Sequence, residues 1–383
     1  MQLHRSNTQA SLLPHRRHVA LVRPEADPQA RGPEVATQLR LEPPLQGLRE
    51  ELVVALGDFK DEVLVVPAEH PGDANTYKEA VAEAVEACAD DTKSQTCYIC
   101  TQALHWKTNE GLVRGCACRG TAGFAHVSCL AEQAKILFAE AVENNLGAKA
   151  WNERWMQWES CSLCEQKYYG VVRCALGWAC WKTHGGQPEE AWARGAAMTV
   201  LGNGLADVKQ YEDALAVREA DLAMRRHLGE SENNILVAQS NLASTYHDLG
   251  RAESALSINW DVYSTRLERN GEEHISTLTA ANNYASSLIG LWRCKEARAL
   301  FRKMTPVTRR VLGENDEITI RMRYSYAQAI YKDGAPLDDL REAVIALEDV
   351  ARTARRVLGG THPTTDEIED TLQQARAALR ACE

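Results

Sequence analysis

Closely spaced pairs of cysteines, one pair including a histidine, constrain the fold of this chain more than any other feature. The stretch from Cys116 to Cys129 holds three cysteines and one histidine but too little apolar content to fold alone. Two ligands one or two residues apart can bind one ion from a single turn, as tetrahedral zinc requires. Four such pairs occur in order: Cys97 and Cys100, Cys116 and Cys118, His126 and Cys129, Cys161 and Cys164. They predict two Zn²⁺ sites that are structural rather than hydrolytic, because eight ligands leave no coordination position open.

Other interpretations of the cysteines carry less weight. The eight side chains could be reduced thiols in a core, but zinc binding, worth about 10 to 16 kcal/mol per site, would supply the folding free energy that the segment lacks. Cys174, Cys180 and His184 are candidates for a third metal site. The wide gap between these two cysteines and their apolar surroundings instead indicate a buried helix that joins two domains.

The second half of the chain repeats itself. Gly229, Gly271 and Gly313 recur at a spacing of 42 residues, and Gly359 follows after 46. Each unit offers two amphipathic helices joined by a tight turn, and neither helix can bury its apolar face without a neighbour, so the units must stack. We therefore expect a helical repeat array over residues 173–383 that ends in a capping helix.

The remaining segments are less informative. Residues 1–45 have scattered prolines and no acidic residue before Glu25, which predicts a disordered tail or, alternatively, an organelle transit peptide. Residues 46–92 form a short, poorly defined segment, apolar between Leu48 and Val66, that ends in a helix from Tyr77 to Ala89. The zinc finger is expected over residues 93–172.

Both halves resemble known families. The segment Asn241-Leu242-Ala243, with Gly250 and Ala255-Leu256 after it, resembles tetratricopeptide repeats of the kinesin-light-chain type. The order of four cysteines, one histidine and three cysteines resembles the RING-CH finger, a RING variant found in the membrane-associated RING-CH ubiquitin ligases. A plant homeodomain finger, which reads histone tails, shares this order. It normally has Cys-x-x-Cys as its second pair and a tryptophan two residues before the seventh ligand, whereas Trp158 lies three before Cys161.

The RING-CH resemblance implies how the ligands and partners are arranged. Cys97, Cys100, His126 and Cys129 would form the first site, and Cys116, Cys118, Cys161 and Cys164 the second. The platform would bind a ubiquitin-conjugating enzyme charged with ubiquitin, with Ile99 and Leu163 as contact residues, and the repeats would recruit the protein substrate. The implied function is a RING-type ubiquitin-protein ligase, which positions reactants and performs no covalent chemistry itself.

Two positions depart from the family pattern and keep an alternative open. Gln133 replaces the usual tryptophan of the docking helix, and Glu165 stands where many active RINGs have a positive charge. Both favour a non-catalytic zinc-binding scaffold or interaction adaptor. In the repeats, Asn241 and Asn283 fall at equivalent positions, where they would bind a peptide backbone or form hydrogen bonds between helices.

Composition narrows the remaining possibilities. A net charge of −10 argues against a nucleic-acid partner. No apolar run is long enough to insert into a membrane and the N-terminus lacks the apolar block of a secretory signal, so we expect a reducing compartment, the cytoplasm. The predicted fold class is mainly α: a small zinc-bound α+β RING-CH module followed by an α-solenoid of tetratricopeptide-like hairpins.

Overall fold

The structure is a computed structural model that describes residues 73–188, 192–332, 336–360 and 362–383. The predictions for residues 1–45 and for Leu48 to Val66 lie outside these residues. The described part is mainly α-helical, as predicted. Its helices are α2 (Asp73–Ala87), α3 (Val127–Glu143), α4 (Gly147–Trp155), the short 3-10 helix η1 (Met156–Trp158), α5 (Gly170–His184), α6 (Trp192–Asp207), α7 (Tyr211–His227), α8 (Glu232–Asp248), α9 (Ala252–Asn270), α10 (Ile275–Gly290), α11 (Cys294–Leu312), α12 (Glu317–Lys332), α13 (Leu337–Val357) and α14 (Pro363–Cys382).

The cysteine-rich segment contains little extended structure. Two isolated antiparallel bridges, Val113 with Ala125 and Ser160 with Lys167, are the β pairings found among the described residues. The α+β character expected of this module is therefore limited to two bridges between loops. This is consistent with a segment whose loops must be held by something other than a sheet.

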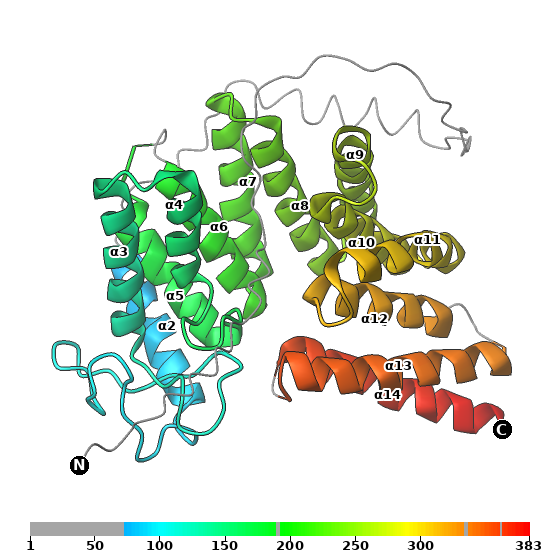
Figure 1. Cartoon of the computed structure of the whole chain (residues 1–383), viewed down its shortest axis with the longest axis horizontal. Helices are drawn as coiled ribbons and strands as arrows, with labels where there is room; N and C mark the ends of the chain where they lie inside the picture. The colour runs from blue at the N-terminus through cyan, green and yellow to red at the C-terminus, as the bar shows by residue number, and fades with distance from the viewer. Residues whose placement is uncertain (1–72, 189–191, 333–335, 361) are drawn as a thin grey trace, which may run out of the picture.

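The helices form a curved array. Loops of the cysteine-rich segment gather around the ends of α2 and α3, and the helices from α5 onward follow one another side by side (Figure 1). The array bends so that α13 and α14 cross the direction of α7 and α8, and the turn between α13 and α14 points back toward the cysteine-rich loops (Figure 1).

Helix α5 joins the two halves, as the buried-helix interpretation predicted. Val172 and Leu176 belong to the core beneath the cysteine-rich loops, whereas Cys180 belongs to the core of the first repeat helices. Glycines let α5 and α6 approach closely: a Cβ on Gly204 would lie 2.7 Å from the Cα of Cys174. The first half is therefore packed directly against α6.

The repeated glycines end the second helix of successive hairpins. Gly229, Gly271, Gly313 and Gly359 all have positive φ angles, between 61° and 102°, a region that glycine enters without a Cβ penalty. After each of these turns a polar residue begins the next helix. The side chains of His274 and His362, for example, accept hydrogen bonds from backbone N–H groups of α10 and α14. The period in the sequence thus corresponds to a glycine with positive φ at each of the four turns.

The tryptophans between Cys129 and Cys161 pack into the core, as predicted. Trp155 ends α4 and Trp158 lies in η1, and both are buried. The indole of Trp151, partly exposed, donates a hydrogen bond to the carbonyl of Ala141 at 3.0 Å, which fixes α4 against α3. This helical pair fills the long interval between the third and fourth ligand pairs.

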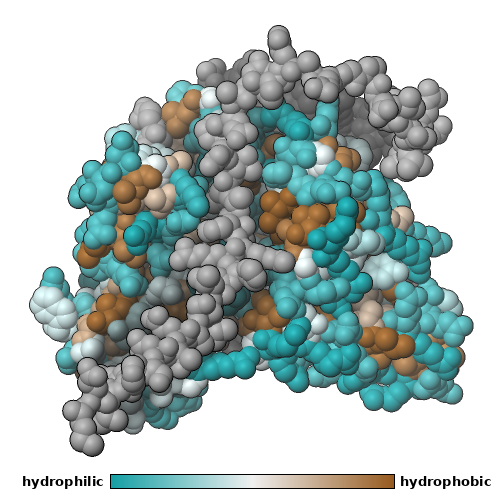
Figure 2. Space-filling view, in the orientation of Figure 1, coloured by the Kyte–Doolittle hydropathy of each residue, from teal (hydrophilic) through white to brown (hydrophobic). Residues whose placement is uncertain are grey.

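Polar side chains dominate the visible surface. Among the coloured residues on the face shown in Figure 2, hydrophilic ones predominate and apolar residues gather in separate patches. Within the described ranges, no helix is long and apolar enough to cross a membrane.

One buried arginine ties three helices of the array together. Arg218 on α7 is 7% exposed and donates to Gly202 and Asn203 on α6, and to Asn241 and Thr245 on α8. None of these four acceptors is a carboxylate. Burial lowers the pKa of Arg218 to about 10, so the guanidinium is still charged at neutral pH.

We expect Arg218→Ala to destabilise the array by about 2 to 4 kcal/mol, because it removes a buried side chain and its hydrogen bonds to two neighbouring helices. Urea unfolding followed by circular dichroism measures the loss. The control is Arg226→Ala, an exposed arginine of the same helix, which should change stability by no more than about 0.5 kcal/mol. Equal effects of the two substitutions would contradict this role of Arg218.

His184 at the end of α5 is a neutral histidine in an aromatic cage. This residue is 5% exposed, and its ring lies 5.1 to 5.9 Å from the rings of Phe138, Trp155 and Trp158. Burial, and then the charge of Lys135, lower the pKa of His184 to about 4. The folded protein therefore resists protonation of a group that the unfolded chain protonates near pH 6.5.

This difference predicts a pH-dependent stability. The contribution of neutral His184 is complete above about pH 6.5 and declines as the pH falls toward 4, by roughly 3 kcal/mol in all. The replacement His184→Phe should flatten the slope of the unfolding free energy between pH 6.5 and 5. His227→Gln, a change at an exposed histidine, should leave that slope as in the parent protein. An unchanged slope in His184→Phe would rule out this source.

Candidate metal centre

The structure brings the eight predicted ligands into two groups of four. Within each group the ligand atoms all lie within 4.8 Å of one another. The first group is Cys97, Cys100, His126 and Cys129, and the second is Cys116, Cys118, Cys161 and Cys164. The pairs therefore alternate between the two groups along the chain, as the RING-CH resemblance implied.

Distances between ligand atoms fit tetrahedral zinc. With Zn–S bonds of about 2.3 Å and Zn–N bonds of about 2.0 to 2.1 Å, two sulfurs lie about 3.8 Å apart and a sulfur and a nitrogen about 3.6 Å. Sγ of Cys118 and Sγ of Cys161 are 3.7 Å apart. Nδ1 of His126 is 3.4 Å from Sγ of Cys100 and 3.6 Å from Sγ of Cys129. Two zinc ions therefore suit both the donor sets and their spacing.

The histidine is oriented for coordination through Nδ1. Its Nε2 lies 3.4 Å from the carbonyl oxygen of Ala103, which would accept its proton, and the ring of His105 packs edge-on at 5.3 Å. Burial lowers the pKa of His126, which favours the neutral imidazole that binds metal. Neither Ala103 nor His105 could be assigned this supporting role from ligand spacing, because the contact depends on how the loop after Cys100 folds back.

The sulfurs of the second group perturb one another strongly. A hydrogen bond from Cys116 lowers the pKa of Cys161 to about 5. The same interaction, together with burial, raises the pKa of Cys116. Four thiolates cannot be held together at this distance without a compensating positive charge, and a divalent ion supplies that charge.

Two turns of the same geometry present the paired ligands. After the first pair, the N–H of Thr101 donates to the carbonyl of Cys97 at 2.8 Å, with φ of 62° at Thr101. After the last pair, the N–H of Glu165 donates to the carbonyl of Cys161 at 2.9 Å, with φ of 58° at Glu165. Each turn directs the two sulfurs of a pair toward one point. Two intervening residues are therefore enough for both cysteines to bind one ion.

A glycine and a carboxylate support the remaining ligands. Gly123 has φ of 83°, and a Cβ there would lie only 2.6 Å from Cβ of Cys118, so the loop needs glycine at this point. Glu110 accepts hydrogen bonds from both the backbone N–H and the hydroxyl of Ser128, at 2.7 and 2.8 Å. This clamp fixes the start of α3 between His126 and Cys129.

A third metal site does not form from the other candidates. Cys174, Cys180 and His184 all lie on α5, and no cluster of metal-binding groups includes them in the part of the chain that the structure describes. Their burial on a helix shared by two cores is explained by packing.

Comparison with known families agrees with this geometry. A RING-variant domain model matches residues 97–144, and a tetratricopeptide repeat model matches residues 235–276 and 277–317. The chain carries a RING-variant domain and tetratricopeptide repeats. The RING-variant match ends before Cys161 and Cys164, which the structure nevertheless places in the second group.

Solved structures and curated sequences add little. The chain is similar to the nearly identical TPR-like repeats of a putative kinesin light chain from Podosopora anserina (17% identity, 60% of this chain and 97% of that chain, TM-score 0.36). It is also similar to BtubC (BKLC) from P. vanneervenii (14% identity, 67% of this chain and 86% of that chain, TM-score 0.39). Structural similarity at these identities and TM-scores supports no further conclusion about this chain. Curated protein sequences give no match.

The predicted partner-contact residues occupy different environments. Leu163 is 52% exposed, whereas Ile99 is half-buried against the core of the RING-variant domain. The turns that carry them are adjacent, because the hydroxyls of Tyr98 and Ser162 lie 3.2 Å apart. Gln133 is partly exposed on α3.

The two repeat asparagines are partly exposed on α8 and α10. Their backbone carbonyls accept hydrogen bonds from the preceding helices: that of Asn241 from Arg218 at 2.7 Å and that of Asn283 from Asn259 at 3.4 Å. Peptide binding by the side chains of Asn241 and Asn283 stays a prediction.

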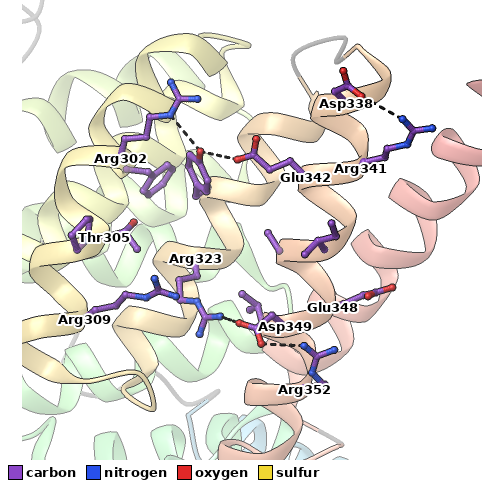
Figure 3. Close-up of a pocket in the computed structure, with 16 residues that line it drawn as sticks. Arg302, Thr305, Arg309, Arg323, Asp338, Arg341, Glu342, Glu348, Asp349 and Arg352 are labelled. Carbon is purple, nitrogen blue, oxygen red and sulfur yellow. Dashed lines mark hydrogen bonds and ion pairs between the residues drawn. The ribbon is translucent and has the colours of Figure 1, made fainter.

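A cavity of about 850 Å³ lies between α11, α12 and α13 (Figure 3). Arg323, in its wall, pairs with Glu314 and Asp349, and Arg302 donates to the hydroxyl of Tyr326 at 3.4 Å. The other arginines of the lining are paired with acidic residues as well: Arg309 with Glu314, Arg341 with Asp338 and Arg352 with Asp349. Because its arginines are already paired, we assign no ligand to this cavity.

The geometry predicts two zinc ions per chain by elemental analysis of the purified protein. Cys118→Ser should lower the content to about one, because it removes a thiolate from the second group only. Cys174→Ser, which changes a buried cysteine outside both groups, should retain two. Full zinc content in Cys118→Ser would show that the second group does not bind the ion as described.

Proposed function

We propose that this protein is a RING-type ubiquitin-protein ligase, in which the RING-variant domain recruits a charged ubiquitin-conjugating enzyme and the repeats recruit the protein substrate. The match of the RING-variant model to residues 97–144 supports the first part. The observation that most supports the proposal is the adjacency of the two ligand turns, in which the hydroxyls of Tyr98 and Ser162 lie 3.2 Å apart. Ile99 and Leu163 are the next residues in these two turns.

The chemistry required of this platform is positioning. Zinc, when bound, stabilises the loops and supplies no reacting group, because each group of four ligands saturates a tetrahedral ion. The platform would hold the thioester of the conjugating enzyme close to a substrate amine, and such proximity alone accounts for large rate increases. Thiolate ligands also suit a reducing compartment such as the cytoplasm.

The tetratricopeptide repeats support the second part of the proposal. Stacked helical hairpins offer extended binding surfaces for other proteins. Asn241 and Asn283, at equivalent places on α8 and α10, are the residues that we expect to contact the backbone of a bound segment.

Ile99→Ala should weaken binding of a ubiquitin-conjugating enzyme roughly tenfold or more and slow autoubiquitination in a reconstituted reaction, because it removes an apolar anchor from the platform. Isothermal titration calorimetry against a panel of conjugating enzymes measures the affinity. Ile345→Ala is the matched control: this isoleucine is 67% exposed on α13 and outside the RING-variant domain.

The alternative of a non-catalytic scaffold makes the opposite prediction. If no conjugating enzyme of the panel binds the zinc-loaded protein, the ligase proposal fails and the scaffold interpretation stands. Gln133 and Glu165, which depart from the family pattern, are the specific reason for keeping this second candidate.

A further inference from the structure

The turn between α13 and α14 contacts the segments that carry the second group of ligands. The rings of His362 and Tyr169 meet edge-on with centroids 5.4 Å apart. A Cβ on Gly359 would lie 3.9 Å from Cβ of Ala117. Ala117 separates Cys116 from Cys118, and Tyr169 follows shortly after Cys164, so both contacts fall beside the second metal site.

Charged groups extend this contact to the start of α12. Burial by itself would raise the pKa of Glu317, but the charges of Arg321, Lys167 and His362 lower it overall. Glu317 forms an ion pair with Arg321 at 2.9 Å. Lys167 belongs to the last ligand segment, where it forms an isolated bridge with Ser160. Lys167 and His362 thus act electrostatically on Glu317 at the start of α12, in addition to the aromatic contact made by the start of α14.

Helix capping orders the ring of His362 and the backbone of Tyr169. His362 is the N-cap of α14, and its Nδ1 accepts a hydrogen bond from the N–H of Thr364 at 3.2 Å. Tyr169 is the N-cap of α5, and its own N–H donates to the carbonyl of Gly115 at 3.0 Å. The ring of His362 therefore meets Tyr169 without the ordering cost of a free side chain.

We propose that the second metal site, when its ligands hold zinc, is a docking surface for the α13–α14 turn, and that this contact keeps the repeat array closed on the RING-variant domain. The ligand segments on either side of Ala117 and before Tyr169 have no sheet to hold them, so metal coordination creates the surface that the turn meets. Loss of the ion would release the turn and open the array.

Closure has a consequence that rests on the proposed ligase function. The turn contacts Ala117 and Tyr169 and leaves Leu163 exposed. A closed array would then hold a repeat-bound substrate at a fixed distance from a conjugating enzyme on the platform. An open array would lose this positioning, although both binding sites would be intact.

The test measures the distance between the RING-variant domain and the turn directly. Spin labels on genetically encoded keto amino acids replace the exposed Arg119 and Gly360, which leaves the native cysteines free for zinc. Pulsed electron paramagnetic resonance of the zinc-loaded protein should give one short, narrow distance. In the double variant Lys167→Glu, His362→Asn the short-distance fraction should fall to about half or less, with zinc content still two per chain.

The substitutions are chosen to separate docking from folding. Asparagine is a good N-cap, so His362→Asn keeps the cap of α14 and removes only the ring. The matched control is Lys149→Glu, His274→Asn, because Lys149 is an exposed residue of α4 and His274 caps α10 in the same way. It should keep the short distance.

Removal of zinc by a chelator should broaden the distance as the double variant does. A short, narrow distance that persists in the zinc-loaded double variant would overturn the proposal. The measurement involves neither ubiquitin nor a conjugating enzyme. Its failure would therefore leave the proposed ligase function standing, and failure of enzyme binding would leave the docking contact standing.

Discussion

Convergence of eight cysteine and histidine side chains into two groups that fit Zn²⁺ is the constraint on which the first half of this structure depends. The second group joins Cys118 to Cys161, and the interval between them contains α3, α4 and η1. Closing so long a loop costs little more entropy than closing a shorter one. Binding of a structural zinc ion contributes about 10 to 16 kcal/mol of folding free energy in small peptides, which more than offsets the entropy cost of closing this loop. Bound ions would therefore help to place the helices between the ligands, together with the packing of those helices.

Helix α5 couples the metal-ligand segments to the repeats. This helix starts soon after the last ligand and packs on one side beneath the cysteine-rich loops and on the other against α6. No flexible linker separates the two parts at this point. The close approach of Gly204 to Cys174 excludes even a methyl group from the contact. The orientation of the metal centre is thereby transmitted to the first repeat, and from there along the stacked hairpins.

Local patterns in the sequence were sufficient to predict the ligands and the repeat turns. Ligand spacing identifies Cys97 and Cys100 as a pair because one turn decides their geometry, and the period of 42 residues identifies Gly271 because each hairpin needs one left-handed residue. Long-range features could not be predicted in this way. Arg218 looks like an ordinary charged residue of an amphipathic helix, yet its acceptors lie on the helices before and after its own. The contact between His362 and Tyr169 could not be predicted from sequence patterns either. It depends on the curvature of the repeat array, which is the sum of small rotations between neighbouring hairpins. No single residue specifies that sum.

Glu165 separates two properties that a RING platform usually combines. Its backbone conformation is required by the turn that presents Cys161 and Cys164, and Thr101 shows the same conformation in the first turn. The backbone at residue 165 is therefore fixed whatever its side chain, and the side chain is exposed. A carboxylate there cannot make the favourable contacts of a cation with an acceptor-rich partner surface. The proposed recruitment of a conjugating enzyme through Ile99 and Leu163 would not depend on this charge, whereas activation of a bound ubiquitin would. For this chain, recruitment of a conjugating enzyme and activation of its ubiquitin are thus separate properties. Recruitment can be strong even where activation is weak.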